Sequence, residues 1–147
     1  MSEFSSSPEG LGSGWQLDHI GHAVKDIENA LVSYQSRCGF VVVEREELPE
    51  QLVRVAFLRG QSSELIELIQ PLPGNQPLAR FLERRGEGLH HLCYRVGSVT
   101  DELKRLAGLG VKLIDTAPRL GSRGLHIAFL HPNSFHGALI EICSVGK

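Results

Sequence analysis

The chain has 147 residues, enough for one domain or for two small halves that share a core. A net charge of −2 provides no basic excess for binding a phosphate backbone, and no apolar run approaches the length of about 18 residues that would predict a membrane-spanning helix. Cys38, Cys93 and Cys143 are too few and too scattered for a disulfide framework or a zinc knuckle, and the N-terminal sequence has no apolar signal region, so we expect a cytoplasmic protein.

Secondary-structure signals follow a regular order in the first half of the chain. Residues 1–14 are rich in serine and glycine, and we expect them to form a flexible leader. Asp26 is placed to cap a helix whose apolar residues recur every three or four positions until Gly39. Strands are predicted at 15–24, 40–48, 53–59 and 64–72, and a second, short helix is predicted at 77–85.

The same order recurs in the second half. The sequence predicts strands at 88–96, 111–115, 125–130 and 138–144, a helix at 99–109 and a glycine-containing hairpin at 118–124. Both halves therefore have the order βαβββ, which predicts an α+β domain over 15–147 built from two modules, 15–75 and 88–147.

Residues with chemical potential occupy matching positions of this repeat. When Asp18-His19-Ile20 is set over His90-His91-Leu92, the two strands align and a helix follows each. Ile66-Glu67-Leu68 then matches Ile140-Glu141-Ile142, with nearly the same offset along the chain. Each half thus contributes one histidine and one glutamate at equivalent places.

These four residues suggest a metal site. Because side chains alternate across a strand, Glu67 and Glu141 are each flanked by apolar residues on both faces. An ionised carboxylate in such surroundings is costly unless it is paired or bound to a metal. If the halves pack about a pseudo-twofold axis, His19, Glu67, His91 and Glu141 converge, and this mixed nitrogen and oxygen set suits Mn²⁺, Co²⁺, Fe²⁺, Ni²⁺ or Zn²⁺.

Other readings of the single residues are open. A histidine at the start of a strand is more often structural than a ligand, and a strand glutamate can face water, so only the paired occurrence favours a metal site. Alternation places His22 and His90 on the face opposite to the proposed ligands, as structural neighbours, and it places Cys143 beside Glu141 as a packing residue. Three further histidines surround the last hairpin and could line the mouth of a pocket: His126, His131 and His136.

Several stretches of the sequence resemble a known family. They are LDHIGHAVKDIENAL, PEQLVRVAFL, ELIELIQPL, ARFLERRGEGLHHLCYRV, LIDTAPRLGSRGLHIAFLHP and ALIEI. From about residue 16 to residue 145 the chain resembles the methylmalonyl-CoA epimerases, a branch of the vicinal oxygen chelate (glyoxalase/bleomycin-resistance) superfamily. The runs RGEGLHH and IAFLHP are the most specific to this branch.

The resemblance implies a fold, a cofactor and a reaction. It implies that paired βαβββ modules form an eight-stranded, cup-shaped mixed sheet with the helices outside, often as a homodimer. It implies that His19, Glu67, His91 and Glu141 hold a divalent metal, typically Co²⁺ or Mn²⁺. The implied reaction inverts the carbon alpha to the carbonyl of a methylmalonyl-CoA-like thioester, with Glu141 as both ligand and proton carrier and the metal stabilising the enolate.

The chain also departs from the family pattern. Val55 stands where some epimerases have a second catalytic glutamate, so the second proton carrier is open: a water, or a glutamate from the Glu44–Glu47 region. In the loop after Pro132, Asn133 replaces a lysine, Phe135 and His136 are bulkier than the usual residues, and His126 stands where a basic residue is frequent. Loss of cationic groups weakens the prediction of CoA as the carrier.

Three alternatives to an epimerase follow. A glyoxalase-like lyase or isomerase, or another metal enzyme of the superfamily with a different small substrate, is the main one. An extradiol dioxygenase fits less well, because that chemistry prefers two histidines and one carboxylate. Non-catalytic binding proteins of the superfamily typically lack the ligands, so the complete set of four argues against that reading.

Overall fold

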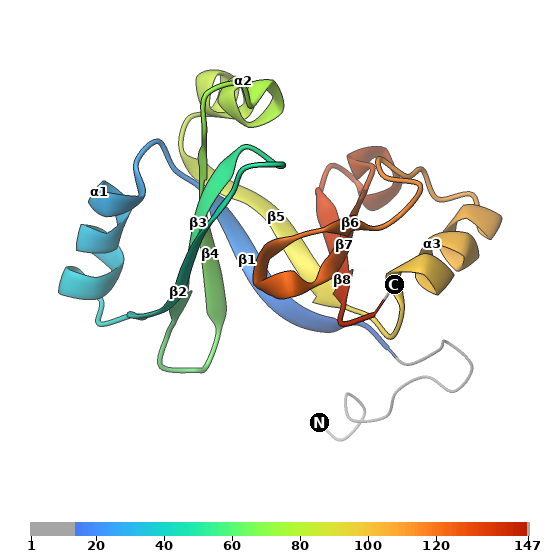
Figure 1. Ribbon diagram of the computed structural model, residues 1–147, viewed down its shortest axis with the longest axis horizontal. Coiled ribbons are helices and arrows are strands. Elements are labelled where there is room, and N and C mark those ends of the chain that lie inside the picture. The colour runs from blue at the N-terminus through green and yellow to red at the C-terminus, as the bar shows by residue number, and fades with distance from the viewer. Residues whose placement is uncertain (1–13, 147) are drawn as a thin grey trace.

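Eight strands form one curled, mixed sheet in the computed structural model, which describes residues 14–146 (Figure 1). The strand order is β2-β3-β4-β1-β5-β8-β7-β6, and β1 lies parallel to β4 and antiparallel to β5. The strands are β1 (Gln16–Ala23), β2 (Val41–Leu48), β3 (Val53–Arg59), β4 (Leu65–Pro71), β5 (Gly88–Arg95), β6 (Arg119–Leu120), β7 (His126–Leu130) and β8 (Ile140–Ser144). The cup-shaped mixed sheet with outer helices is thereby confirmed.

The helices begin at capping residues that the sequence supplies. Asp26 accepts a hydrogen bond from the Glu28 amide and starts α1 (Ile27–Leu31), which continues as the π-helical turn η2 (Val32–Arg37). Gly39, with φ of 74°, follows this turn, as predicted. Two further helices, α2 (Gln76–Arg85) and α3 (Val99–Gly108), are capped by Asn75 and Ser98.

The two faces of the sheet differ in what covers them. On the outer face of the second half, Leu103 and Leu106 of α3 pack against Ile140 and Ile142 of β8. The first half repeats this arrangement, with α1 packed on alternate residues of β3 and β4. Figure 1 shows α1 and α3 at opposite ends of the sheet and α2 beside the ends of β4 and β5. The inner face is therefore left to line a hollow.

One predicted strand is wrong. Residues 111–115 form only a single bridge, Leu113 to Leu130, and the edge strand is instead β6, inside the segment predicted as a hairpin. The ladder stops because the Asp115 carboxylate accepts the Phe129 amide at 2.8 Å. The Ile114 and Asp115 amides both donate to the single Phe129 carbonyl, which leaves no regular pairing to continue.

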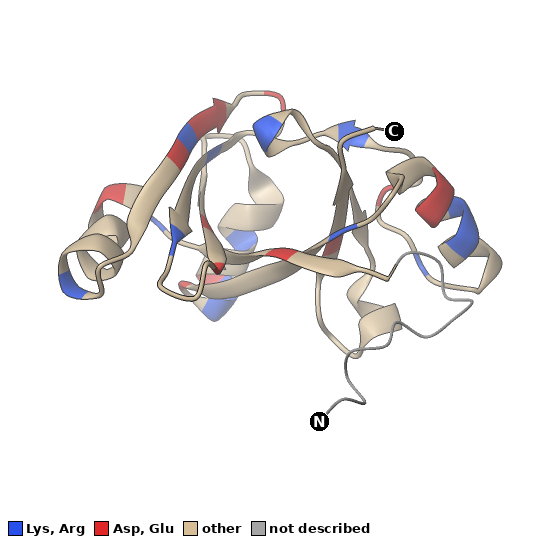
Figure 2. Ribbon diagram, turned by 90° about the horizontal axis from the view of Figure 1, so that it is seen from below, with Lys and Arg blue, Asp and Glu red and all other residues tan. Residues whose placement is uncertain are grey.

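The two edges of the sheet meet across the hollow. The Glu46 carboxylate on β2 accepts the amide of Arg123 at 2.7 Å, and Gln51 donates to the Leu120 carbonyl. Arg123 belongs to the short 3-10 turn η3 (Ser122–Gly124), which follows β6. Figure 2, seen from below, shows the sheet curling until η3 faces β2, with basic and acidic residues interspersed along the ribbon. These hydrogen bonds thus connect the two edges of the curled sheet.

Two expectations stay predictions. The predicted leader lies outside the described residues except for Gly14, and the module boundaries 15–75 and 88–147 are untested. Within residues 14–146, no helix is both long and apolar enough to cross a bilayer.

Candidate metal centre

A cavity of about 320 Å³ opens on the inner face of the curled sheet. Its walls are mainly apolar and come from both halves, with Val55 and Ile69 on one side and Ile127 and Phe129 on the other. Among the described residues, two carboxylates line it, and these are Glu67 and Glu141. The cavity therefore combines a mainly apolar lining with the two acidic residues that the sequence analysis proposed as ligands.

Three of the four predicted site residues, Glu67, His91 and Glu141, line this cavity, and the fourth, His19, contacts all three. The Nε2 atoms of His19 and His91 are 3.2 Å apart. Oε1 of Glu67 lies 3.2 Å from His91 Nε2 and 3.4 Å from His19 Nε2, and Oε1 of Glu141 lies at 3.3 and 3.4 Å from the same atoms. All four side chains are at most 8% exposed. The structure thus brings together residues that are up to 122 positions apart in the sequence.

The position of the four residues follows from the strand order. They lie on β4, β1, β5 and β8, which are the four consecutive central strands of the sheet. Gly21 of β1 pairs with both Glu67 and His91, and a β-carbon at Gly21 would come within 2.2–2.6 Å of the His91 ring. A glycine at this position therefore makes room for the His91 imidazole.

Burial and mutual attraction act in opposite directions on the ionisation of the four groups. Burial lowers the pKa of His19, but hydrogen bonds with Asp18, Glu141 and Glu67 outweigh it and raise that pKa to about 11. The same competition raises the pKa of His91 to about 9. Burial raises the pKa of Glu67, yet the two histidines hold it down at about 2, and they hold the pKa of Glu141 well below its usual range. Without metal, the quartet is thus two imidazolium groups facing two carboxylates.

Metal uptake should release protons and become tighter as pH rises. A metal ion needs the neutral Nε2 of each histidine, so binding displaces about two protons from imidazoles whose pKa values are raised. In the metal-free protein, the stabilisation from charged histidines is fully present below pH 6.5 and is lost as pH rises through about 9 and 11. Chelator-competition titrations between pH 6 and 9 and proton release in weak buffer measure this, and uptake that is independent of pH would contradict it.

The four side chains fit a divalent metal. Two imidazole nitrogens and two carboxylate oxygens form a donor set suited to Mn²⁺, Co²⁺, Fe²⁺, Ni²⁺ or Zn²⁺. His19, His91 and Glu141 each place one donor atom within 4.8 Å of the others, and Glu67 joins them through its contacts with both histidines. The Asp18 carboxylate lies 2.8 Å from Nδ1 of His19, which leaves Nε2 for a metal.

Replacing Asp18 by asparagine should weaken metal binding by about 10- to 100-fold, because the carboxylate orients His19 and raises its basicity. Fluorescent-chelator competition at fixed pH measures the metal Kd. The matched control is Asp101→Asn in the exposed first turn of α3, which should leave the Kd unchanged. Equal affinities for both variants would show that Asp18 does not support the site.

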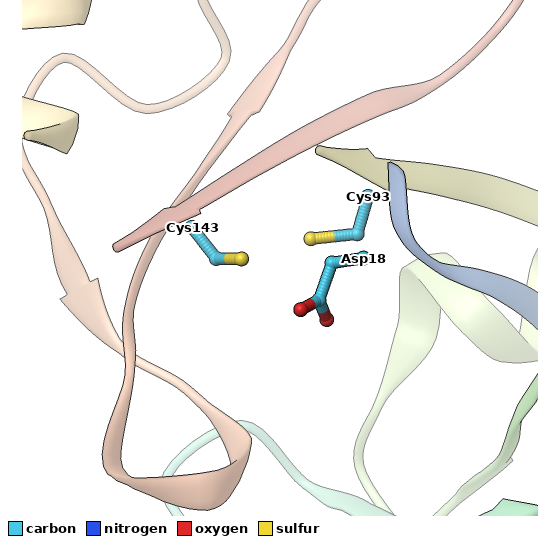
Figure 3. Close-up of side chains that lie close together, drawn as sticks. All are labelled: Asp18, Cys93 and Cys143. Atoms are coloured by element: carbon cyan, nitrogen blue, oxygen red, sulfur yellow. The ribbon is translucent and has the colours of Figure 1, made fainter. Parts of the chain in front are cut away.

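Asp18 also lies beside two cysteines behind the metal centre. Figure 3 shows its carboxylate next to the thiols of Cys93 and Cys143, which come from β5 and β8. The Asp18 oxygens already accept hydrogen bonds from Arg95 and Arg123, so this group is poorly suited to a second cation. Both cysteines are buried with Leu125 and Ile127, which confirms the packing role predicted for Cys143.

The other histidines have mixed outcomes. His22 bonds to the Tyr34 hydroxyl at 2.7 Å on the helical side of the sheet, as predicted. His90 was predicted to face away from the cavity, which is wrong: its ring lines the cavity, with Nδ1 2.8 Å from Nδ1 of His91. In the pairing with β1, Gly21 matches His91 and His22 matches Leu89, so His90 sits in a bulge that interrupts alternation. The idea of three further histidines at the pocket mouth is also wrong, since the described lining does not include His126, His131 or His136.

Arg123 is a site residue that the sequence did not reveal. Its guanidinium donates to Asp18, lies 3.4 Å from Nδ1 of His19 and stacks over the Phe57 ring at 4.6 Å. It reaches this place because the backbone at Arg123 adopts a φ of 57° within the GSRG turn. The glycines on both sides marked a turn, but no local signal indicated that its arginine crosses to β1.

Comparison with known proteins identifies the superfamily of the chain. A family model for the Glyoxalase/Bleomycin resistance protein/Dioxygenase superfamily matches residues 18–129, and the chain belongs to that superfamily. It is 41% identical over 128 residues to the uncharacterized protein YqjC of Bacillus subtilis, covering 87% of this chain and 91% of that one. It is 34% identical over 129 residues to the ethylmalonyl-CoA/methylmalonyl-CoA epimerase of Cereibacter sphaeroides, covering 86% and 96%. A methylmalonyl-CoA epimerase structure in complex with methylmalonyl-CoA and NH4+ aligns with a TM-score of 0.82 at 31% identity, covering 90% of this chain and 95% of that one.

Proposed function

We propose that the protein is a metal-dependent epimerase that inverts the alpha carbon of a methylmalonyl-CoA-like acyl thioester. The observation that carries the proposal is the convergence of His19, His91, Glu67 and Glu141, of which the last three line an apolar cavity. The chain is also 30–34% identical to epimerases, which supports the same reaction class. Co²⁺ or Mn²⁺ is the proposed metal, and a small acyl thioester is the proposed substrate.

Each residue has a definite part in this proposal. His19, Glu67, His91 and Glu141 hold the metal, which when bound supplies positive charge to the oxygen that becomes negative as the alpha proton leaves. A Glu141 carboxylate oxygen takes the alpha proton from one face. Val55, Ile69 and Phe129 exclude bulk water from that face, which strengthens the electrostatic interactions within the cavity.

The residues that line the cavity limit the candidates for the second proton carrier. Val55 lines the cavity and has no proton to give, and the lining in the described residues includes none of residues 44–47. Glu46 is instead engaged with the Arg123 amide. We therefore assign the return of a proton on the opposite face to a solvent water, and the hydroxide left behind takes up the proton that Glu141 removed, which restores the carboxylate.

Deuterium exchange tests the reaction directly. Protein loaded with Co²⁺ or Mn²⁺ is incubated with a single stereoisomer of methylmalonyl-CoA in D₂O, and alpha deuteration and inversion are followed by NMR and chiral analysis. The proposal expects both, and expects neither in chelator-treated protein. Exchange that is absent from metal-loaded protein overturns it, and the lack of stoichiometric metal after loading would favour a binding protein.

A glyoxalase-like isomerase is the second candidate, and one observation favours it. Val55 lines the cavity where some epimerases have a second catalytic glutamate, and an isomerase that moves a proton along one face needs a single carboxylate base. A panel of acyl thioesters and hemithioacetals separates the candidates. Turnover of hemithioacetals without alpha deuteration of thioesters would replace the epimerase proposal. The homodimer also stays a prediction, which light scattering of the metal-loaded protein tests.

A further inference from the structure

A second hollow, of about 270 Å³, lies behind the metal centre at the other end of the strands. Val53 and Val55 at the start of β3 line the main cavity, whereas Arg59 at the end of β3 lines this hollow. In the same way, His91 of β5 lines the main cavity and Arg95 lines the hollow. The two spaces are therefore distinct and lie on opposite sides of His19.

Positive charge is concentrated in this second hollow. Three arginines, Arg59, Arg95 and Arg123, surround one carboxylate, that of Asp18. Asp18 accepts from Arg95 at 2.9 Å and also from Arg123, while Arg59 donates to the Ser63 carbonyl at 2.9 Å. Because one negative group faces three guanidiniums, the lining has an excess of two positive charges in a chain whose net charge is −2.

The arginines also retain hydrogen-bond donors. Nε of Arg123 is buried and has no hydrogen-bond partner among the described residues, so this donor is closed to a ligand in the hollow. Arg95 and Arg59 each use one guanidinium nitrogen in the bonds named above, which leaves further N–H groups. Guanidinium groups present paired donors whose spacing matches the oxygens of phosphate.

We propose that this hollow, the three-arginine pocket, binds the oxyanion of a phosphate group, either free phosphate or a phosphate carried by an organic molecule. An anion there neutralises the excess positive charge and offers acceptors to the remaining donors. A cation is unsuited to the pocket, because the Asp18 carboxylate is already shared by Arg95, Arg123 and His19. The inference is independent of the proposed reaction, since it uses none of the residues assigned to proton transfer.

Calorimetric titration with inorganic phosphate tests the pocket. Arg59→Gln is the diagnostic variant, because Arg59 does not bond to Asp18 and its loss leaves the support of His19 in place. We expect phosphate to bind the metal-loaded protein and the variant to bind at least about tenfold more weakly, since a charged hydrogen bond is lost. The matched control is Arg54→Gln, also on β3, whose guanidinium pairs with Glu47 outside the pocket and whose loss should leave the phosphate affinity unchanged.

Two further measurements make the outcome decisive. Phosphate bound to the metal would persist in Arg59→Gln, so equal binding by that variant and the original protein overturns the proposal, as does the absence of saturable binding. In ¹⁵N NMR spectra, the Nε–H signal of the half-exposed Arg95 should shift on titration in the original protein, and an unmoved signal counts equally against the pocket. Thermal unfolding of both variants checks that they are folded.

The source of the anion is resolved by a second ligand. Adenosine 3′,5′-bisphosphate carries phosphate on an organic group and is titrated in parallel with inorganic phosphate. Tighter, Arg59-dependent binding of the bisphosphate identifies a phosphorylated organic molecule, whereas tighter binding of inorganic phosphate identifies the free ion. If neither ligand depends on Arg59, the three-arginine pocket is not a phosphate site.

Discussion

Replacing Glu141 by glutamine is expected to lower the rate of alpha-proton exchange by about 10²- to 10⁴-fold at saturating metal. Glutamine keeps the size of the side chain and an oxygen that can still contact a metal, but it cannot accept the alpha proton. Metal affinity should therefore fall much less than the exchange rate. The rate is measured as deuterium incorporation into methylmalonyl-CoA, with the metal content of each sample determined beforehand.

Glu67→Gln is the matched control for this variant. Both glutamates line the same cavity, both are nearly inaccessible, and their Oε1 atoms lie at nearly equal distances from the two histidines. The geometry alone does not distinguish them, and the assignment of the base to Glu141 rests on the family resemblance. If both variants lose exchange to the same extent, the two glutamates act as equivalent ligands and Glu141 has no separate role as proton carrier.

The convergence of the four residues could be predicted because two simple signals agreed. Alternation along β4 and β8 placed Glu67 and Glu141 among apolar neighbours, and the internal repeat matched each with a histidine. The structure shows the same symmetry in space, since each of the four central strands β4-β1-β5-β8 contributes one of the four residues. Duplication turns a weak local signal into a stronger one, because the same chemistry has to arise twice.

The features that escaped prediction depend on backbone irregularity or on distant contacts. The bulge at His90 breaks the alternation on which its orientation was judged, and nothing in the local sequence marks it. The strand predicted at 111–115 does not form, because the Asp115 side chain accepts the hydrogen bond of the Phe129 amide in place of a backbone carbonyl. Arg123 meets Asp18 across 105 positions, and such a pairing is visible only once the sheet has curled.

Gly21→Ala should disrupt the metal centre although it replaces none of the proposed ligands. An alanine β-carbon would lie within 2.2–2.6 Å of the His91 ring, so the buried imidazole has to move away from Glu67 and Glu141. Overpacking of this kind costs about 1–3 kcal/mol of unfolding free energy. Because displacing a site residue by about 1 Å can cost about 10²-fold in function, we expect metal affinity to fall at least about tenfold.

The matched control for Gly21→Ala is Gly88→Ala, two pairs further along the same strand pair. Gly88 pairs with Ala23, and a β-carbon there would meet no atom within 4 Å. Metal titration and thermal denaturation of the metal-free proteins separate the effect on the site from the effect on stability. Gly88→Ala should retain the metal Kd, whereas normal affinity in a folded Gly21→Ala protein would show that His91 can shift and still bind. In that case, metal binding would not require the position that His91 occupies next to Gly21. The four site residues would then tolerate a shift of one ligand despite their burial.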